Sequence, residues 1–378
     1  MMDIATRRLE SQRLAGNALQ TADQVVGWLG AVQAQDYPAA VWALGQRTRA
    51  ATAAEVHLLF DTGAIVRTHV LRPTWHFVLP ADIRWLLALT APRLRAGIGR
   101  RWRDLGIDHG VIARAEAAFI DALAGGRQLP RVELGAVLQA SGIAPDGQRL
   151  PYLILAAELD ALVVSGPRRG RDFTYMLMDD RVPAAAPLSP EEALRRLAER
   201  YFRSRGPAQL RDFAWWAGTT QAEARRGVAA AGDSLASEVI DGKEYWFGNV
   251  AAGTALAAAS APAALRARMS GAPVAHLLPN FDELTVAYRD RSAADHPDGR
   301  FDPGLFGFGS ILSNVLMIGG RVRGAWRRVV GVKSVRVQVL LLDPLRPAER
   351  TAVARAADRL GWFLESPIEL EWEGPRAG

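Results

Sequence analysis

The stretch Ala31-Val32-Gln33-Ala34-Gln35-Asp36-Tyr37-Pro38 decides how the rest of the chain is interpreted. It ends a run of apolar residues with helical spacing, from Val25 onward, and it places two amides one residue apart before a proline. Proline disfavours helical backbone at the residue that precedes it, so we expect the helix to end near this point. On extended backbone Gln33 and Gln35 would share one face and reach into one cleft. The alternative is a helix C-terminus whose amides hydrogen-bond to nearby backbone groups.

The composition leaves most familiar enzyme classes without support. A chain of 378 residues has room for several small domains, and 49% hydrophobic with 23% charged residues is ordinary for a globular protein. Without cysteine there is no disulfide, thiolate metal site or thiol nucleophile. The six histidines lack metal-ligand spacing, and the sequence contains neither a glycine-rich phosphate loop nor the G-x-S-x-G motif. We therefore expect no metal and no cofactor.

The charge pattern favours a polyanionic partner. The net charge is +6 and the isoelectric point is about 10.1. The basic residues are nearly all arginine, a bias that a GC-rich genome would also produce, and the only lysines are Lys243 and Lys333. Lysine chemistry through a Schiff base therefore has few candidates. No apolar run has the length of a membrane span and the first residues lack a signal-peptide block, so we expect a cytoplasmic, nucleoid-associated bacterial protein without a membrane partner.

The pattern of elements predicts a mainly α fold with β-hairpins (α+β). Groups of short helices are followed three times by a hairpin, at residues 65–79, 162–177 and 239–247. Helices followed by a hairpin are typical of winged-helix units, and a run rich in proline and alanine at 183–190 indicates a linker. We expect three tandem winged-helix units and a β-rich C-terminal region, with boundaries at 1–107, 108–182, 189–270 and 271–378.

Several segments together resemble one family, the AlkZ-type winged-helix DNA glycosylases, to which the YcaQ-type enzymes are related. The matching segments occur in the expected order and cover most of the chain: Val32-Gln33-Ala34-Gln35, Arg67 to Val78, Glu158 to Arg169, Gly206 to Trp216, Leu277 to Arg291 and Gly324-Ala325-Trp326-Arg327. The resemblance implies a C-shaped scaffold that holds double-stranded DNA carrying alkylated purines. It also implies that Gln33 and Gln35 are catalytic, since the family signature is glutamine, an apolar residue and glutamine.

The chemistry suits two neutral amides. Purines alkylated at N7 are cationic and leave readily, so their release needs a positioned water and stabilisation of a sugar cation more than an acid. With so few lysines, we expect a monofunctional glycosylase without lyase activity, acting as a monomer. The resemblance leaves open whether interstrand crosslinks are also unhooked. The alternative is a winged-helix protein that binds DNA without catalysis, as a regulator or as a shield over adducts.

The predicted DNA contacts lie on three hairpins. Arginines would hold phosphates and aromatic rings would stack or probe a groove. The alternatives are a packed wing, a solvated turn and an edge strand made soluble by charge. The candidates are Arg72, Trp75, His76, Arg168, Arg169, Arg171, Arg323, Trp326, Arg327 and Arg328. For Asp282, Tyr288 and Arg291 we expect a structural role in an ion pair or a turn.

Overall fold

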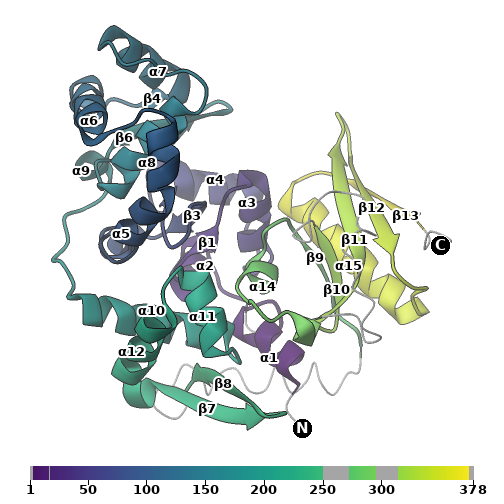
Figure 1. Ribbon diagram of the computed structural model, residues 1–378. Coiled ribbons are helices and arrows are strands. Elements are labelled where there is room, and N and C mark those ends of the chain that lie inside the picture. Colours follow the sequence, from purple (N-terminus) through teal and green to yellow (C-terminus); the bar gives the residue numbers. More distant parts are fainter. Residues whose placement is uncertain (1–2, 17, 250–271, 295–313, 374–378) are drawn as a thin grey trace.

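One order of elements occurs repeatedly along the chain. The computed structural model describes residues 3–16, 18–249, 272–294 and 314–373 (Figure 1). After α1 (Ile4–Ser11), a helix is followed by a short strand, two helices and a hairpin, and this order appears in two places in full. The first unit consists of α2 (Ala22–Leu29), β1 (Val32–Gln33), α3 (Tyr37–Gly45), α4 (Ala53–Thr62), β2 (Val66–His69) and β3 (Trp75–Val78). The second consists of α6 (His109–Leu123), β4 (Leu129–Pro130), α7 (Arg131–Ala140), α8 (Arg149–Leu159), β5 (Val163–Arg169) and β6 (Asp172–Leu177).

The two units also share a sheet topology. The strand orders are β1-β3-β2 and β4-β6-β5, so the short strand pairs with the last strand of each hairpin. The long helix α5 (Pro80–Asp104) joins the units, and α9 (Met178–Arg181) precedes the predicted linker. A third group has the same order with a single bridge, Ala208 to Trp246, in place of the short strand. It consists of α10 (Pro190–Arg205), α11 (Leu210–Ala217), α12 (Gln221–Ala231), β7 (Leu235–Ile240) and β8 (Lys243–Gly248).

Local sequence signals account for most helix ends. Thr52 and Thr220 each form a capping box with the glutamate three residues later, and Ser189 accepts a hydrogen bond from the Glu192 backbone. Thr21, at the N-terminal cap position of α2, makes no such side-chain bond. The helix before the two glutamines ends at Leu29, earlier than expected, because Gly30 adopts a φ of +77°.

The C-terminal region is a five-stranded sheet covered by one helix. The strand order is β13-β12-β11-β10-β9, and only the β12–β13 pair is parallel. The region also includes the one-turn helix α14 (Glu283–Val286) beside the first unit (Figure 1). Its other elements are β9 (Ala275–Leu278), β10 (Val315–Ile318), β11 (Arg321–Val330), β12 (Val335–Leu341), α15 (Pro347–Phe363) and β13 (Ile368–Glu373).

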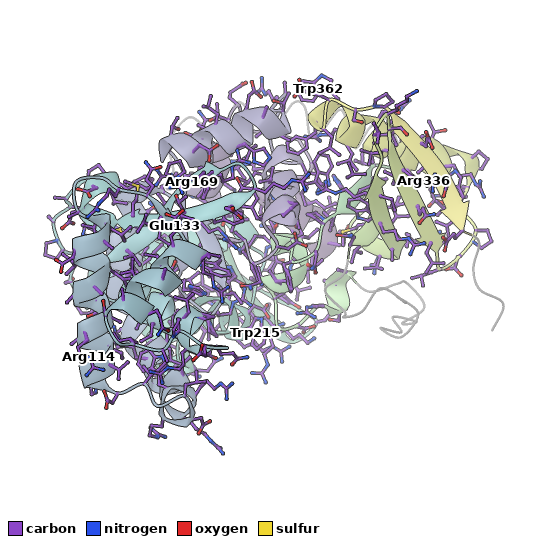
Figure 2. All side chains as sticks on the ribbon, turned by 90° about the horizontal axis from the view of Figure 1, so that it is seen from above. Arg114, Glu133, Arg169, Trp215, Arg336 and Trp362 are labelled. Carbon is purple, nitrogen blue, oxygen red and sulfur yellow. The ribbon has the colours of Figure 1, made fainter. Side chains whose placement is uncertain are left out.

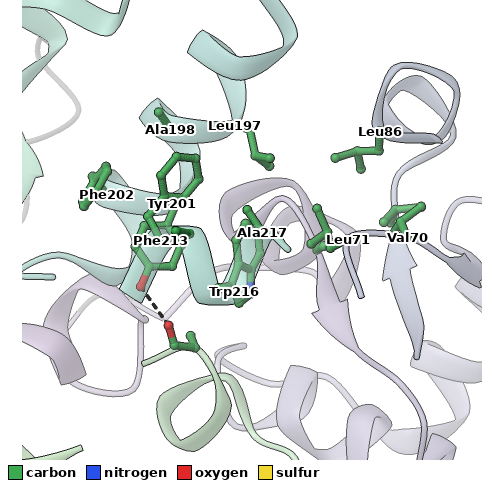
Figure 3. Packing of buried hydrophobic residues seen from close by; sticks show 14 of the residues in the cluster. Val70, Leu71, Leu86, Leu197, Ala198, Tyr201, Phe202, Phe213, Trp216 and Ala217 are labelled. Atoms are coloured by element: carbon green, nitrogen blue, oxygen red, sulfur yellow. Dashed lines mark hydrogen bonds between the residues drawn. The ribbon is translucent and has the colours of Figure 1, made fainter. Parts of the chain in front are cut away.

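The hydrophobic cores cross the predicted unit boundaries. One cluster joins α2, α3 and α4 to the C-terminal sheet and α15. A second joins the first hairpin and α5 to α10, α11 and the sheet, and Figure 3 shows Leu71 beside Trp216 and Ala217 within it. The Tyr201 hydroxyl crosses this core to donate to the Ala287 carbonyl at 2.8 Å. A third cluster lies within the second unit and the end of α5. The first unit therefore shares its hydrophobic core with the third unit and the C-terminal region. The boundaries expected between the units remain untested.

One buried histidine should make stability depend on pH. Burial lowers the pKa of His276, on β9, to about 4, with the Arg359 and Arg47 charges adding to the effect. In the unfolded chain a histidine titrates near 6.5, so between pH 6.5 and 4 the unfolded state binds a proton that the folded state does not. Stability is therefore lost as the pH falls through this window.

We expect the free energy of unfolding to fall between pH 7 and 4 by about 3 kcal/mol more in the wild type than in His276→Gln. Urea unfolding at several pH values measures it. His109→Gln, at an exposed position, is the matched control and should keep the wild-type pH dependence. Equal pH dependence in wild type and His276→Gln would contradict the prediction.

Candidate functional site

Gln33 lies on a strand and Gln35 lies in a bend just beyond it, so neither is on a helix. Gln33 belongs to β1, where it pairs with His76 of β3, and the Ala34 amide donates to the Trp75 carbonyl at 2.7 Å. The strand ends at Gln33, so the shared face expected of the two glutamines stays a prediction. Gln33 is 6% exposed, whereas Gln35 is exposed.

Each amide oxygen accepts a hydrogen bond from a group that can only donate. The Gln33 Oε1 atom accepts from the Arg72 Nη2 atom at 3.0 Å. The Gln35 Oε1 atom accepts from the Trp75 backbone N–H at 3.3 Å. Neither a guanidinium nor a backbone N–H can accept, so the orientation of both amides follows from their partners. The oxygens point to the first hairpin, and the NH2 groups point away from it.

A buried carboxylate holds the backbone of Gln33. The Glu283 Oε1 atom accepts from the Gln33 backbone N–H at 2.8 Å. The Oε2 atom accepts from Trp216 Nε1 at 2.9 Å and from Arg205 Nη2 at 2.5 Å. Glu283 and Arg205 are both fully buried, and together they connect α14 and α10 to β1.

Arg205 also binds the turn that leads into β1. Its guanidinium donates to the carbonyl oxygens of Leu29 at 2.6 Å and Ala31 at 2.9 Å. These carbonyls follow the end of α2, where the backbone would otherwise lack partners. The residues just before Gln33 are thus fixed by one planar side chain from the third unit.

A second buried ion pair supports the same region. Arg47 donates to both carboxylate oxygens of Asp282 at 2.8 Å, and Asp282 caps α14 by accepting from the Leu284 N–H. The Tyr288 hydroxyl donates to the Arg205 carbonyl at 2.8 Å. The structural roles expected for Asp282 and Tyr288 are therefore confirmed.

His76 faces the same side of the sheet as Gln33 and is neutral. Burial lowers the pKa of His76 well below its ordinary value, and the Arg72 charge adds to the effect. The His76 Nδ1–H donates to the Thr74 carbonyl at 2.8 Å, so the Nε2 atom carries the lone pair. The ring is completely buried, and the groove contact expected of His76 does not fit this position.

The opposite face of the hairpin borders a cavity of about 170 Å³ between the first and second units. Its walls include His69, Trp75, Tyr152 and Tyr175. The His69 Nδ1 atom hydrogen-bonds to the buried Glu158 carboxylate, and the His69 and Trp75 ring centroids are 4.5 Å apart. Trp75 therefore lies in the wall of this cavity while its backbone N–H binds Gln35.

The arginines of the second hairpin are mostly engaged in ion pairs. Arg168 donates to both oxygens of Asp61, at 3.0 and 2.7 Å. Arg169 pairs with Glu133 at 2.7 Å on the surface of the second unit (Figure 2). Arg171, in the turn between β5 and β6, is exposed. Contact between DNA and Arg168 or Arg169 would have to compete with these carboxylates.

On β11 the predicted contacts separate into buried and exposed residues. Trp326 is 2% exposed and its Nε1–H donates to the Leu278 carbonyl at 2.7 Å, so its expected stacking on bases is incompatible with its position in the core. Arg323 pairs with Glu349 at 3.0 Å. Arg327 is exposed, and Arg328 lies close enough to Asp36 for that carboxylate to counteract the lowering of the Arg328 pKa by burial. Arg328, near the tip of the β11–β12 hairpin, is therefore close to the residue that follows Gln35 in the chain.

Sequence reasoning missed Arg205, Glu283, His69 and Glu158. Arg205 and Glu283 are 78 residues apart in the chain, and no local spacing connects them. Among the described residues, no group of three or more His, Asp or Glu side chains is placed to hold a metal ion. Within the same residues, no helix combines the length and apolar character needed to cross a membrane.

Removing the Glu283 carboxylate should destabilise the fold strongly. Glu283→Ala leaves a buried guanidinium without its counter-charge, so we expect a loss of about 3–5 kcal/mol in the free energy of unfolding. Urea unfolding at pH 7 is the measurement. Glu133→Ala, which removes the exposed partner of Arg169, is the control and should cost less than about 1 kcal/mol. Similar losses in the two variants would contradict the central role of the buried pair.

Comparisons with known proteins identify the fold and the family of the chain. A solved structure, the DNA glycosylase AlkZ of Streptomyces sahachiroi, matches with a TM-score of 0.74 over 97% of this chain and 98% of that chain, at 20% sequence identity. At that identity the match shows a common fold. No curated protein matches the chain. The family model described as DNA glycosylase AlkZ-like matches residues 26–363. The chain therefore belongs to the AlkZ-like DNA glycosylase family.

Proposed function

We propose that this protein is a monofunctional DNA glycosylase that releases bulky N7-alkylated purines from duplex DNA by attack of water at C1′. The observation that carries the proposal is that the first hairpin holds the amide oxygens of both Gln33 and Gln35. Two amides whose orientations are fixed by one hairpin can hold a water molecule at a defined position.

The reaction needs no strong acid at this site. The C1′–N9 bond breaks and its electron pair neutralises the cationic alkylated purine. The water oxygen forms the new bond to C1′, and a proton passes to solvent. Neutral amides can position that water but cannot protonate a poor leaving group, so the proposed substrates are restricted to bases that damage has already made cationic.

In this proposal each group with the order helix, strand, helix, helix and hairpin is a winged-helix unit, and the three units form the DNA-binding face. The β11–β12 hairpin is a candidate groove contact, since Val330 is 70% exposed and Val332 is fully exposed at its tip. Exposed apolar residues beside arginines suit a wedge at a base step. The exposed Arg327 and Arg171 would hold phosphates on either side.

The aromatic cavity beside Trp75 has the kind of surface that a bulky adduct would need. It lies on the face of the hairpin opposite His76 and Gln33, and the rings of Trp75, Tyr152 and Tyr175 offer flat apolar surfaces to a group that extends past the hairpin. A sequence-reading regulator is less well supported, because residues 153–159 of α8 are all buried and offer no polar face to base edges.

Replacing both glutamines should abolish catalysis without abolishing DNA binding. We expect Gln33→Ala/Gln35→Ala to release free base from a duplex with N7-methylguanine at least about 100-fold more slowly, because the water loses both partners. Mass spectrometry of the released base measures the rate, and binding to the undamaged duplex is the control. Wild-type protein that binds damaged DNA and releases no base would favour an adduct-shielding role. Unchanged release by the double variant would remove the glutamines from the mechanism.

The product should be an intact strand with an abasic site. The Lys243 amine lies 3.2 Å from the Asp290 carboxylate, and among the described residues the side-chain partners of Gln33 are Arg72 and Glu283, with no lysine among them. We expect borohydride to trap no covalent protein–DNA adduct during turnover, and alkali to be needed to cleave the product. A bifunctional glycosylase with a catalytic lysine serves as the positive control. A trapped adduct would contradict the monofunctional mechanism.

A further inference from the structure

We propose that Arg72 is a positioning residue of the glycosylase site, which fixes the Gln33 amide with its NH2 group, not its oxygen, facing the substrate. This inference rests on the proposed function and assigns Arg72 a role other than phosphate binding. It also separates the two glutamines: Gln33 becomes a hydrogen-bond donor to the attacking water, and Gln35, whose oxygen has only a longer bond to a neutral donor, is the acceptor.

The contacts of Arg72 point inward. The bond from Nη2 to Gln33 is the one side-chain hydrogen bond that Arg72 makes among the described residues, and its Nε atom is enclosed without a partner. Burial lowers the pKa of Arg72, so the guanidinium is largely removed from solvent. A phosphate contact would require this group to leave an enclosed position. A bond from a charged donor is also stronger than one from a neutral donor, so it dominates the orientation of the amide.

The orientation of Gln33 follows from this bond. Its oxygen accepts the bond from Arg72. Its nitrogen has no hydrogen-bond partner among the described residues, and it is not one of their polar atoms that are fully buried without a partner. The nitrogen thus keeps contact with solvent and is free to donate to a bound water molecule. A guanidinium bound to the oxygen withdraws electron density from the amide, which strengthens the NH2 group as a donor and weakens the oxygen as an acceptor.

The backbone around Arg72 is held from two other elements. Leu71 has a φ of +62°, and its N–H donates to Thr90 Oγ1 of α5 at 3.2 Å. Its carbonyl oxygen lies against Gly218, where a Cβ atom would be only 2.1 Å away. The Arg72 N–H donates to the Val70 carbonyl at 2.6 Å, which closes a tight turn. An arginine that only binds phosphates does not require its backbone to be fixed from two other elements, so this arrangement favours the positioning role.

The experiment combines Arg72→Met with Gln33→Ala in a double-mutant cycle. Base release from a duplex with one N7-methylguanine is measured under single turnover with saturating enzyme. Binding to the undamaged duplex is measured at several salt concentrations. We expect Arg72→Met to lower the rate at least about 10-fold with unchanged Kd and salt slope, and to lower it no further when Gln33 is already alanine.

Arg171→Met is the matched control, because Arg171 is exposed and would act on phosphates. It should weaken binding and reduce the salt slope by about 1. The same result for Arg72→Met, or rate effects of Arg72→Met and Gln33→Ala that simply multiply, would overturn the positioning role. Absence of base release by the wild type would instead reject the proposed function.

Discussion

The site depends on burying a carboxylate at the point where the first unit, the third unit and the C-terminal region meet. Glu283 is fully enclosed, and it must be paired because an isolated buried charge is very costly. Arg205, Trp216 and the Gln33 backbone satisfy it together. Gln33 comes from the first unit and Arg205 and Trp216 come from the third, so the charge on Glu283 brings three regions of the chain to one place. The backbone of Gln33 is thus held in place because its N–H is one of the donors that the buried Glu283 carboxylate needs.

Some of the arginines that make the chain basic are buried in its interior and stabilise the fold. Arg47 and Arg205 are fully buried and bind carboxylates and carbonyls with several nitrogens at once. A lysine has no planar fork for such contacts, so part of the arginine excess serves the fold, whatever the genome composition contributes. The charge that DNA would meet is carried by exposed residues such as Arg171 and Arg327. The number of arginines in the sequence is therefore larger than the number available to contact a nucleic acid.

Local signals in the sequence predicted the elements well and the contacts poorly. Capping residues and turn glycines located most helices, and the two hairpins at 65–79 and 162–177 follow from alternating residues. The shared face of Gln33 and Gln35 stays a prediction, because it needs extended backbone through Gln35 and β1 ends at Gln33. Trp326 and His76 were expected to contact DNA, yet both are buried. The sequence pattern of an aromatic ring among polar neighbours is the same whether the ring lies in a core or faces a DNA groove. The Arg205–Glu283 pair was invisible because it joins residues 78 positions apart.

The contact between the Leu71 carbonyl and Gly218 has an evolutionary consequence. The glutamines belong to the first unit, yet the hairpin that touches them rests on the third, and the carboxylate beneath them belongs to the C-terminal region. A shortened relative that ended before residue 190 would retain both amides with Arg72 and Trp75, and would lose Arg205, Gly218 and Glu283, which fix the backbone around them. If the first unit were transferred alone to another gene, the Gln33-Ala34-Gln35 motif would be kept, but the buried contacts that hold its backbone would be lost.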